Sequence, residues 1–394
     1  MRFLVVSTDL VPFLRWLYAV HPGLARRPYD EQMRARVDSL YFRADFYSSN
    51  LRRLGHEAWD VFADNLFMQA AWAREYAPRL LPSQADTSTP APHLAERHGP
   101  ADHGFYPGQW HLDPCHPTSR WLYAVLAAQI RHYAPDVLVN QDMYLSTRFL
   151  REMRPLVRLL IGQHWSRQLP DEDYSCYDLV VSSFPPTVAG MRQRGIPAAQ
   201  LRLGFEPRVL TAMGPAEHRY AVTFVGGLYG EGIHRGRVTF IEELCRAVPE
   251  LRVWGYGIRT LPSDSPIHAH YSGHAWGSAM LRILRHSRLT INHHGSVLPH
   301  ANNMRLFEAT GVGSLLITDH KDDLSEMFAP GREVVTYRTA DDCVERIRHY
   351  LAHERERAEI ARRGQQRTLA EHTYLRRMEE LADLARRSLR RVPA

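Results

Sequence analysis

The sequence is poor in lysine and cysteine and contains no long apolar run. Of its 49 Lys and Arg residues, only Lys321 is a lysine, a skew typical of a GC-rich genome rather than of selection for phosphate binding. The four cysteines are widely spaced with no C-x-x-C pair, which argues against a metal-site pattern and a disulfide framework. No run of about 18 apolar residues occurs, so we expect no membrane-spanning segment. Residues Arg2–Ser7 become polar too soon for a signal peptide, so we expect a cytoplasmic protein.

The basic residues are spread along nearly the whole chain. The formal net charge is +6, yet no basic block is interleaved with aromatic residues, which argues against nucleic-acid binding. A positive cleft for an anionic small molecule is compatible with this charge. A chain of 394 residues is too long for one ordinary hydrophobic core, which predicts two domains.

Short apolar runs recur along the chain, separated by helical patterns. Such Val-, Leu- and Ile-rich runs suit strands buried on both faces of a parallel sheet. Two series of them predict an α/β protein with two doubly wound, Rossmann-like domains. We expect domains at residues 1–206 and 207–373 and a C-terminal helix, 374–394, that packs back on the protein. The predicted strands are Phe3–Ser7, Glu57–Phe62, Asp136–Asn140, Val157–Gly162 and Asp178–Ser182, then Val222–Gly226, Leu251–Trp254, Leu289–Asn292, Ser314–Thr318 and Glu333–Tyr337.

The segment from Asn302 to Gly313 carries the most informative side chains. It places Glu308 on a short helix that ends at glycines just before a buried strand. Near the carboxyl ends of parallel strands, such a glutamate can accept two hydrogen bonds from a cis-diol such as a ribose. Arg305 shares a helical face with Glu308, so it could pair with Glu308 or donate to a phosphate. A surface ion pair is the competing interpretation.

A second candidate is the Gly226-Gly227 pair, which ends a predicted strand. Glycines there let the backbone approach an anionic ligand, and the next helix presents free amides and a positive dipole. Two arginines follow, Arg235 and Arg237. Arg237 comes directly before the helical pattern and is our first choice for a ligand-binding cation, with Arg235 second.

Many short stretches, in the right order, resemble CgeB-like glycosyltransferases, relatives of the large retaining GT4 group with the GT-B fold. The likeness covers roughly residues 135–377. It implies two Rossmann-like domains facing a cleft, and transfer of a sugar from a nucleotide-diphosphate sugar to an unidentified carbohydrate, small-molecule or protein acceptor. The stretches are Tyr177–Ser183, Gly195, Leu203–Pro207, Asn303–Asp319, Leu324–Tyr337, Ile360–Gly364, His372–Tyr374 and Arg376/Arg377.

The resemblance implies roles for residues of the donor site. Glu308 matches the glutamate that binds the nucleotide ribose in GT4 enzymes, and Gly226-Gly227 with Arg237 matches the loop that holds the diphosphate. The GT4 motif has another glutamate eight residues earlier, where this sequence has His300, which could serve as a hydrogen-bond donor. We assign Asn303, on the same segment, to this site as well, and Arg305 with Arg237 to catalysis.

In the first domain, the resemblance points to His164. It ends a predicted strand and looks like the GT4 histidine that faces the donor sugar, which would make it catalytic; a structural histidine is the alternative. Residues 81–119, dense in Pro, His, Gly and small polar residues, fit either an acceptor-side lid or a disordered insertion.

We expect no cofactor and no metal. The adjacent His293 and His294 would point to opposite faces of a strand and could not easily ligate one ion. The resemblance implies that cations and helix dipoles take the place of a metal ion, as they generally do in GT-B enzymes. Two other interpretations stay open: a nucleotide-sugar epimerase or hydrolase on the same fold, and a non-catalytic, spore-coat-like structural protein.

Overall fold

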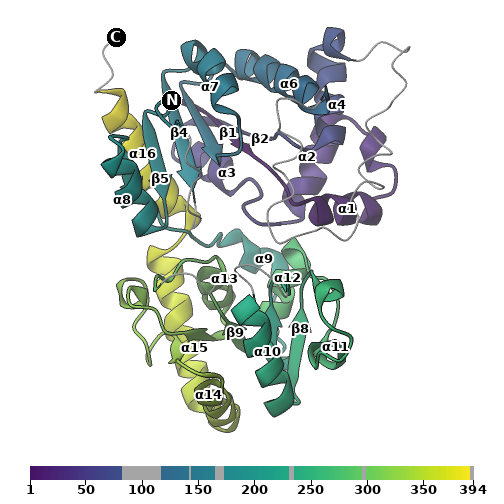
Figure 1. Ribbon diagram of the computed structural model, residues 1–394, viewed down its shortest axis with the longest axis vertical. Helices are drawn as coiled ribbons and strands as arrows, with labels where there is room; N and C mark the ends of the chain where they lie inside the picture. Colours follow the sequence, from purple (N-terminus) through teal and green to yellow (C-terminus); the bar gives the residue numbers. More distant parts are fainter. Residues whose placement is uncertain (82–116, 142, 165–172, 230–234, 295–298, 391–394) are drawn as a thin grey trace. The chain divides into compact units, whose positions relative to one another are not determined.

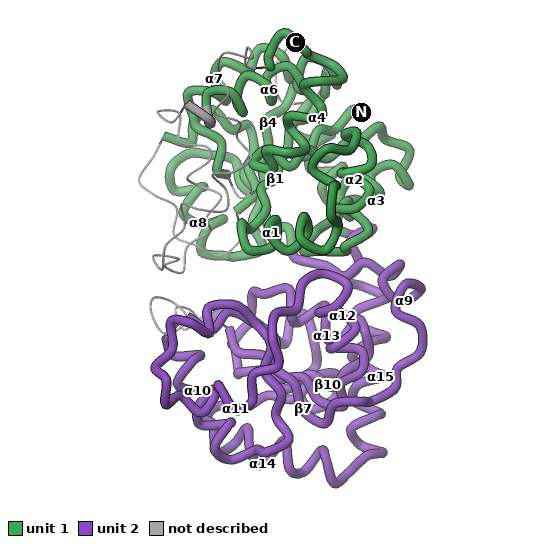
Figure 2. The backbone as a smooth tube through the Cα atoms, turned by 90° about the vertical axis from the view of Figure 1, so that its right-hand side faces the viewer, with its two compact units in different colours: residues 1–99, 105–202, 377–394 green, residues 100–104, 203–376 purple. Residues whose placement is uncertain are grey.

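The chain forms two compact units. The structure, a computed structural model, describes residues 1–81, 117–141, 143–164, 173–229, 235–294 and 299–390. Unit 1 comprises the described residues of 1–202 together with 377–390, and unit 2 those of 203–376 (Figure 2). The irregular segment at 81–119 lies almost wholly outside the described residues. Within the described ranges, no helix is long and apolar enough to cross a membrane.

Unit 1 is built on a six-stranded parallel sheet with the order β2-β1-β3-β4-β5-β6 (Figure 1). Every neighbouring pair in this order is parallel. The elements are β1 (Arg2–Ser7), α1 (Val11–Val20), α2 (Tyr29–Asp38), α3 (Phe46–Arg53), β2 (Glu57–Phe62), α4 (Leu66–Tyr76), α6 (Pro117–Tyr133), β3 (Val137–Gln141), α7 (Thr147–Met153), β4 (Leu159–His164), β5 (Leu179–Ser182), α8 (Pro185–Gln193) and β6 (Ala198–Gln200).

The C-terminal helix α16 (Tyr374–Leu389) runs from the end of unit 2 into unit 1 and packs there. Four of its apolar side chains are fully buried, Met378, Leu381, Ala382 and Ala385. They recur at helical spacing and form one face of the helix. This confirms the predicted C-terminal helix that packs back on the protein.

Unit 2 contains a five-stranded parallel sheet with the order β11-β10-β9-β7-β8. Its neighbouring strands are also parallel throughout. The elements are α9 (Arg208–Met213), β7 (Tyr220–Val225), α10 (Arg235–Ala247), β8 (Leu251–Trp254), α11 (Ile267–His270), α12 (Gly277–Arg285), β9 (Ser287–Asn292), α13 (Arg305–Val312), β10 (Leu315–Asp319), β11 (Val335–Tyr337), α14 (Ala340–Ala352) and α15 (Glu354–Glu371).

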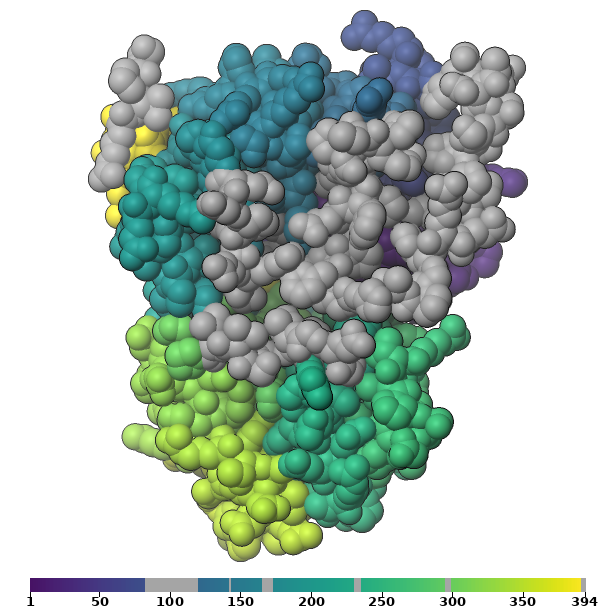
Figure 3. Space-filling view, viewed as in Figure 1, coloured from purple at the N-terminus to yellow at the C-terminus, as the bar shows by residue number. Residues whose placement is uncertain are grey.

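The two faces of the unit 2 sheet differ in character. Side chains such as Phe224 and Ile291 point to one face and join an apolar cluster with residues of α10 and α14. Successive strand residues alternate between faces, so Thr223 and Thr290 point to the other. Their hydroxyls lie 3.3 Å apart there, in hydrogen-bond contact. The outer sides of α10 and α14 are exposed and form part of the surface in Figure 3.

The structure confirms the predicted fold class, with two parallel sheets in an α/β protein. The strand ends differ in places for local reasons. Val157 follows a turn of 3-10 helix over Arg154–Leu156, so β4 starts only at Leu159. Glu333 lies in a turn in which Gly331 adopts φ 77° and donates its N–H to Val334, so β11 starts at Val335.

Candidate functional site

The strand order of unit 2 identifies a binding position at the carboxyl ends of its strands. The chain runs outward to β8 on one side of β7 and to β9, β10 and β11 on the other. In doubly wound sheets, ligands bind at the carboxyl ends of strands where the order reverses. That position lies between the carboxyl ends of β7 and β9, and we call it the β7/β9 edge. Gly226-Gly227 follows β7 here, and His293-His294 follows β9.

Backbone contacts hold the Gly226-Gly227 loop after β7. Gly226 donates its N–H to Trp254 at 3.0 Å, and Leu228 donates to Tyr256 at 2.8 Å. Gly255 passes so close to this loop that a Cβ on it would lie 1.8 Å from the Gly226 carbonyl oxygen. Only glycine permits that approach. The loop is therefore fixed against the end of β8 as well as β7.

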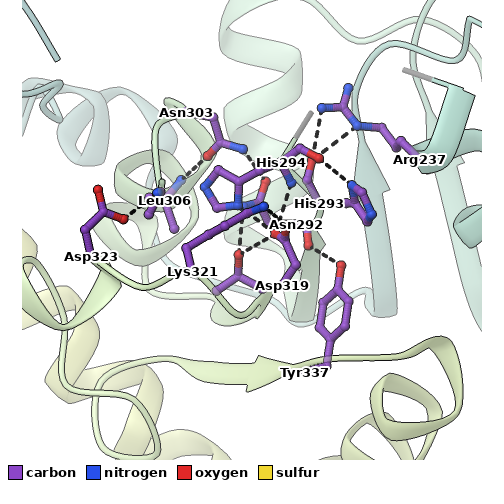
Figure 4. Close-up of polar contacts among 12 residues, drawn as sticks. Arg237, Asn292, His293, His294, Asn303, Leu306, Asp319, Lys321, Asp323 and Tyr337 are labelled. Carbon is purple, nitrogen blue, oxygen red and sulfur yellow. Dashed lines mark hydrogen bonds and ion pairs between the residues drawn. The ribbon is translucent and has the colours of Figure 1, made fainter. Parts of the chain in front are cut away.

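Arg237, on α10, links the ends of β7 and β9. Its Nε and Nη2 both donate to the carbonyl oxygen of His293, at 3.2 and 2.9 Å (Figure 4). Its Nη1 lies 3.8 Å from where a Cβ on Gly226 would be. Burial lowers the pKa of Arg237, although the guanidinium stays charged at any working pH. Arg235, two residues earlier, is exposed.

Arg305 and Glu308 form an ion pair at the start of α13. Arg305 Nη1 lies 2.6 Å from Glu308 Oε2, with side-chain exposures of 13% and 11%. Arg305 Nη2 donates to the carbonyl oxygen of Val225, the last residue of β7, at 3.1 Å. Burial raises the pKa of Glu308, and the positive charge of Arg305 opposes that rise. Arg305 therefore fastens Glu308 to the strand end that leads into Gly226-Gly227.

Asn303 and His300 both make polar contacts with other residues of unit 2. Asn303 Oδ1 accepts from the Leu306 N–H at 3.3 Å, and its Nδ2 donates to Asn292 Oδ1 at 2.8 Å. The amide of Asn303 therefore joins the start of α13 to the end of β9. His300 Nδ1 lies 3.1 Å from Asp323 Oδ2, and about a quarter of its side chain is exposed.

His164 is the last residue of β4 in unit 1. It is buried and pairs with Ser182 across the sheet. The other predicted site residues, Gly226, Gly227, Arg235, Arg237, His300, Asn303, Arg305 and Glu308, all belong to unit 2. Of these, the structure brings Gly226, Arg237, Arg305, Glu308 and Asn303 to the β7/β9 edge.

Comparisons with known proteins bear on the family and on the fold. The family model of glycosyl transferase-like proteins matches residues 236–383, which include β9, α13 and all of α10 except its first residue. That part of the chain is similar to glycosyl transferase-like proteins. No curated protein matches the sequence significantly.

Solved structures resemble the whole chain at low sequence identity. A glycosyltransferase from Rickettsia africae ESF-5 has a TM-score of 0.58 at 10% identity, covering 99% of this chain and 99% of that chain. Sucrose-phosphate synthase from Thermosynechococcus elongatus has a TM-score of 0.57 at 11% identity, covering 100% of both chains. Anabaena HepE, solved in complex with UDP-glucose, has a TM-score of 0.55 at 11% identity, covering 98% of this chain and 100% of that chain. The fold is GT-B.

Sequence reasoning missed a charged cluster at the same edge, formed by His294, Asp319 and Lys321 (Figure 4). His294 Nδ1 lies 2.6 Å from Asp319 Oδ1, and Lys321 Nζ lies 3.3 Å from Asp319 Oδ2. Burial alone would raise the pKa of Asp319, but hydrogen bonds and charge from His294 hold it well below its usual value. One signal was present in the sequence, because His294 and Asp319 each lie at or just beyond a strand end. The sequence alone does not show that these two strands, β9 and β10, are neighbours in the sheet.

Proposed function

We propose that this protein is a glycosyltransferase that binds a nucleoside diphosphate sugar at the β7/β9 edge of unit 2. The observation that carries the proposal is the placement of Arg305, which joins the Glu308 carboxylate to the end of β7. The same strand end leads into the Gly226-Gly227 loop, beside Arg237. One carboxylate and two arginines thus surround a glycine loop at a switch point, which suits a ribose followed by a diphosphate. The GT-B fold and the UDP-glucose complex of HepE support this proposal.

We assign the nucleoside to Glu308. Its Oε2 accepts from Arg305. Within the described part of the chain, its Oε1 has no hydrogen-bond partner. A ribose cis-diol supplies hydroxyl donors that this oxygen can accept. The ion pair fixes the carboxylate before the ligand arrives, which lowers the entropy lost on binding.

We assign the diphosphate to Gly226-Gly227 and Arg237. In the transfer, the bond between the anomeric carbon and a β-phosphate oxygen breaks, and the electron pair leaves with the nucleoside diphosphate. An acceptor oxygen bonds to the anomeric carbon and loses its proton. Cations placed in advance beside the departing phosphate stabilise the charge that develops there. Arg237 and Arg305 supply such cations, so we propose that transfer needs no metal ion.

The finer assignments rest on the sequence resemblance. We propose that the protein is a CgeB-like relative of the GT4 group and that it retains the anomeric configuration, as GT4 enzymes do. We keep His164 as a proposed catalytic residue of unit 1. In unit 2, Asn303 then acts by positioning α13 against β9, because both polar atoms of its amide are bonded within the protein.

Calorimetric titration of UDP, GDP and dTDP tests the donor site. We expect one nucleotide to bind, and Glu308→Ala to weaken that binding by about 1–3 kcal/mol, the usual cost of removing a buried hydrogen-bonding partner. Glu345→Ala is the matched control, because Glu345 is an exposed glutamate on α14 of the same unit. It should bind like the wild type.

The outcome also separates the competing interpretations. Failure of all three nucleotides to bind folded wild-type protein would contradict the donor site and favour a non-catalytic structural role. In a separate assay with the matching nucleotide sugar, turnover without any acceptor would favour an epimerase or hydrolase. Equal binding by wild type and Glu308→Ala would reject the role assigned to Glu308.

A further inference from the structure

A tyrosine side chain lies against the glycine loop that follows β7. Tyr256 comes two residues after Trp254, the last residue of β8. Its Cε2, Cζ and Oη atoms each lie 3.5 Å from where a Cβ on Gly227 would be. The hydroxyl end of the ring is therefore the part that meets the loop. The contact lies within unit 2, because β7 and β8 are neighbouring strands of one sheet.

The loop also has a backbone donor that the described part of the protein does not use. Gly226 donates its N–H to the carbonyl oxygen of Trp254 at 3.0 Å. Leu228 donates to the carbonyl oxygen of Tyr256 at 2.8 Å. Between them, Gly227 is buried, and its N–H has no acceptor among the residues that the structure describes. Buried N–H groups are normally hydrogen-bonded, so this one indicates a ligand next to the Tyr256 hydroxyl.

Arg237 approaches the same loop and lies near Tyr256. Its Nη1 is 3.8 Å from where a Cβ on Gly226 would be. Burial lowers the pKa of Arg237, and of the neighbours that oppose this change Tyr256 acts most strongly. The phenol oxygen is therefore close enough to influence the charge of the guanidinium. A backbone N–H, a phenol hydroxyl and a guanidinium thus meet at Gly226-Gly227, and all three can donate hydrogen bonds.

Two other aromatic side chains hold the ring of Tyr256. The ring stacks on Trp276, with centroids 5.3 Å apart and an interplanar angle of 14°. It meets the ring of Tyr229 at a centroid distance of 5.5 Å and an angle of 66°. Trp276 is itself buried and directly precedes α12. Both contacts involve ring atoms, so a phenylalanine at position 256 would keep them and lack only the hydroxyl.

We propose that the hydroxyl of Tyr256 donates a hydrogen bond to the diphosphate of the nucleotide sugar, beside the Gly227 N–H and Arg237. This inference rests on the proposed donor site. A diphosphate is an anion with several acceptor oxygens, so it can satisfy all three donors together. Hydrogen bonds to ionised acceptors are stronger than those between neutral groups, which makes the hydroxyl a measurable part of donor affinity.

Tyr256→Phe tests the hydroxyl alone. We expect it to weaken binding of the nucleotide sugar about tenfold, the scale of one hydrogen bond to a charged group. Titration calorimetry measures this loss with whichever of UDP-glucose, GDP-mannose and dTDP-glucose binds the wild type. The matching nucleoside, which is uridine, guanosine or thymidine, has no phosphate. Its affinity, measured by competition, should therefore be the same for Tyr256→Phe and the wild type.

Tyr220→Phe is the matched control, because Tyr220 begins β7 and lies at the opposite end of that strand from the loop. It should bind the nucleotide sugar like the wild type. Equal binding by Tyr256→Phe and the wild type would overturn the inference and leave the proposed function standing. An equal loss for the nucleoside, or a similar loss in Tyr220→Phe, would also overturn it.

The urea midpoint of each variant is measured before titration. A Tyr256→Phe protein that fails to fold would show that the hydroxyl serves the fold and would contradict the inference. Failure of all three nucleotide sugars to bind folded wild-type protein would instead contradict the donor site itself.

Discussion

Arg305→Met is expected to destabilise unit 2 by about 3–5 kcal/mol, because it leaves the buried Glu308 carboxylate without its cation. The pair is nearly buried and separated by 2.6 Å, so solvent compensates little for the lost charge. Urea unfolding, with hydrogen exchange of peptides from β7 and α13 as the local readout, measures the loss. Arg282→Met on α12 is the matched control, since Arg282 is exposed in the same unit.

Two further comparisons test the reason for this loss. Arg305→Met combined with Glu308→Gln should recover most of the stability, because no unpaired charge then remains. The pKa of Glu308 is already raised above its usual 4.5, so its ionisation costs stability at high pH, and this cost is relieved as pH falls. Without Arg305 that pKa rises further. The deficit of Arg305→Met should therefore shrink from about pH 8 to about pH 5. A constant deficit across this range, or one below about 1 kcal/mol, would contradict the buried-charge account.

Arg237→Gln is expected to weaken donor binding by about 1.5–3 kcal/mol, or roughly 10–150-fold, because it removes a charged hydrogen-bond donor from the diphosphate site. Arg235→Gln should have little effect, because Arg235 is exposed at the start of the same helix. Titration of the same nucleotide sugar into both variants and the wild type gives the comparison. A larger loss of donor affinity in Arg235→Gln would show that Arg235, and not Arg237, is the cation that binds the diphosphate. Equal binding by all three proteins would remove Arg237 from the site.

Many of the buried strands were predictable because they contain continuous apolar runs. The Leu-Leu-Ile run at residues 315–317, in β10, has few interpretations other than a buried parallel strand. The prediction missed β6, Ala198–Gln200, which is three residues long and lies at the edge of its sheet. An edge strand this short carries too few apolar residues for its pattern to stand out from a turn.

At the candidate site, contacts between residues that are close together in the sequence were also predictable. Arg305 and Glu308 are three residues apart on a helix, and helical periodicity alone brings them together. The His294–Asp319 pair depends instead on the register of β9 and β10, in which Asn292 lies opposite Thr318. The donation from Arg237 to the His293 carbonyl depends on how α10 packs on the sheet. Neither relation can be read from a single sequence, because each joins segments distant along the chain.

The most direct test of the donor site is a crystal structure of the protein with the nucleoside diphosphate that binds it in titration. Our account predicts the ribose against Glu308 and the diphosphate against Gly226-Gly227 and Arg237. A nucleotide bound at the ends of other strands, with Glu308 and Arg237 making no contact to it, would contradict the account.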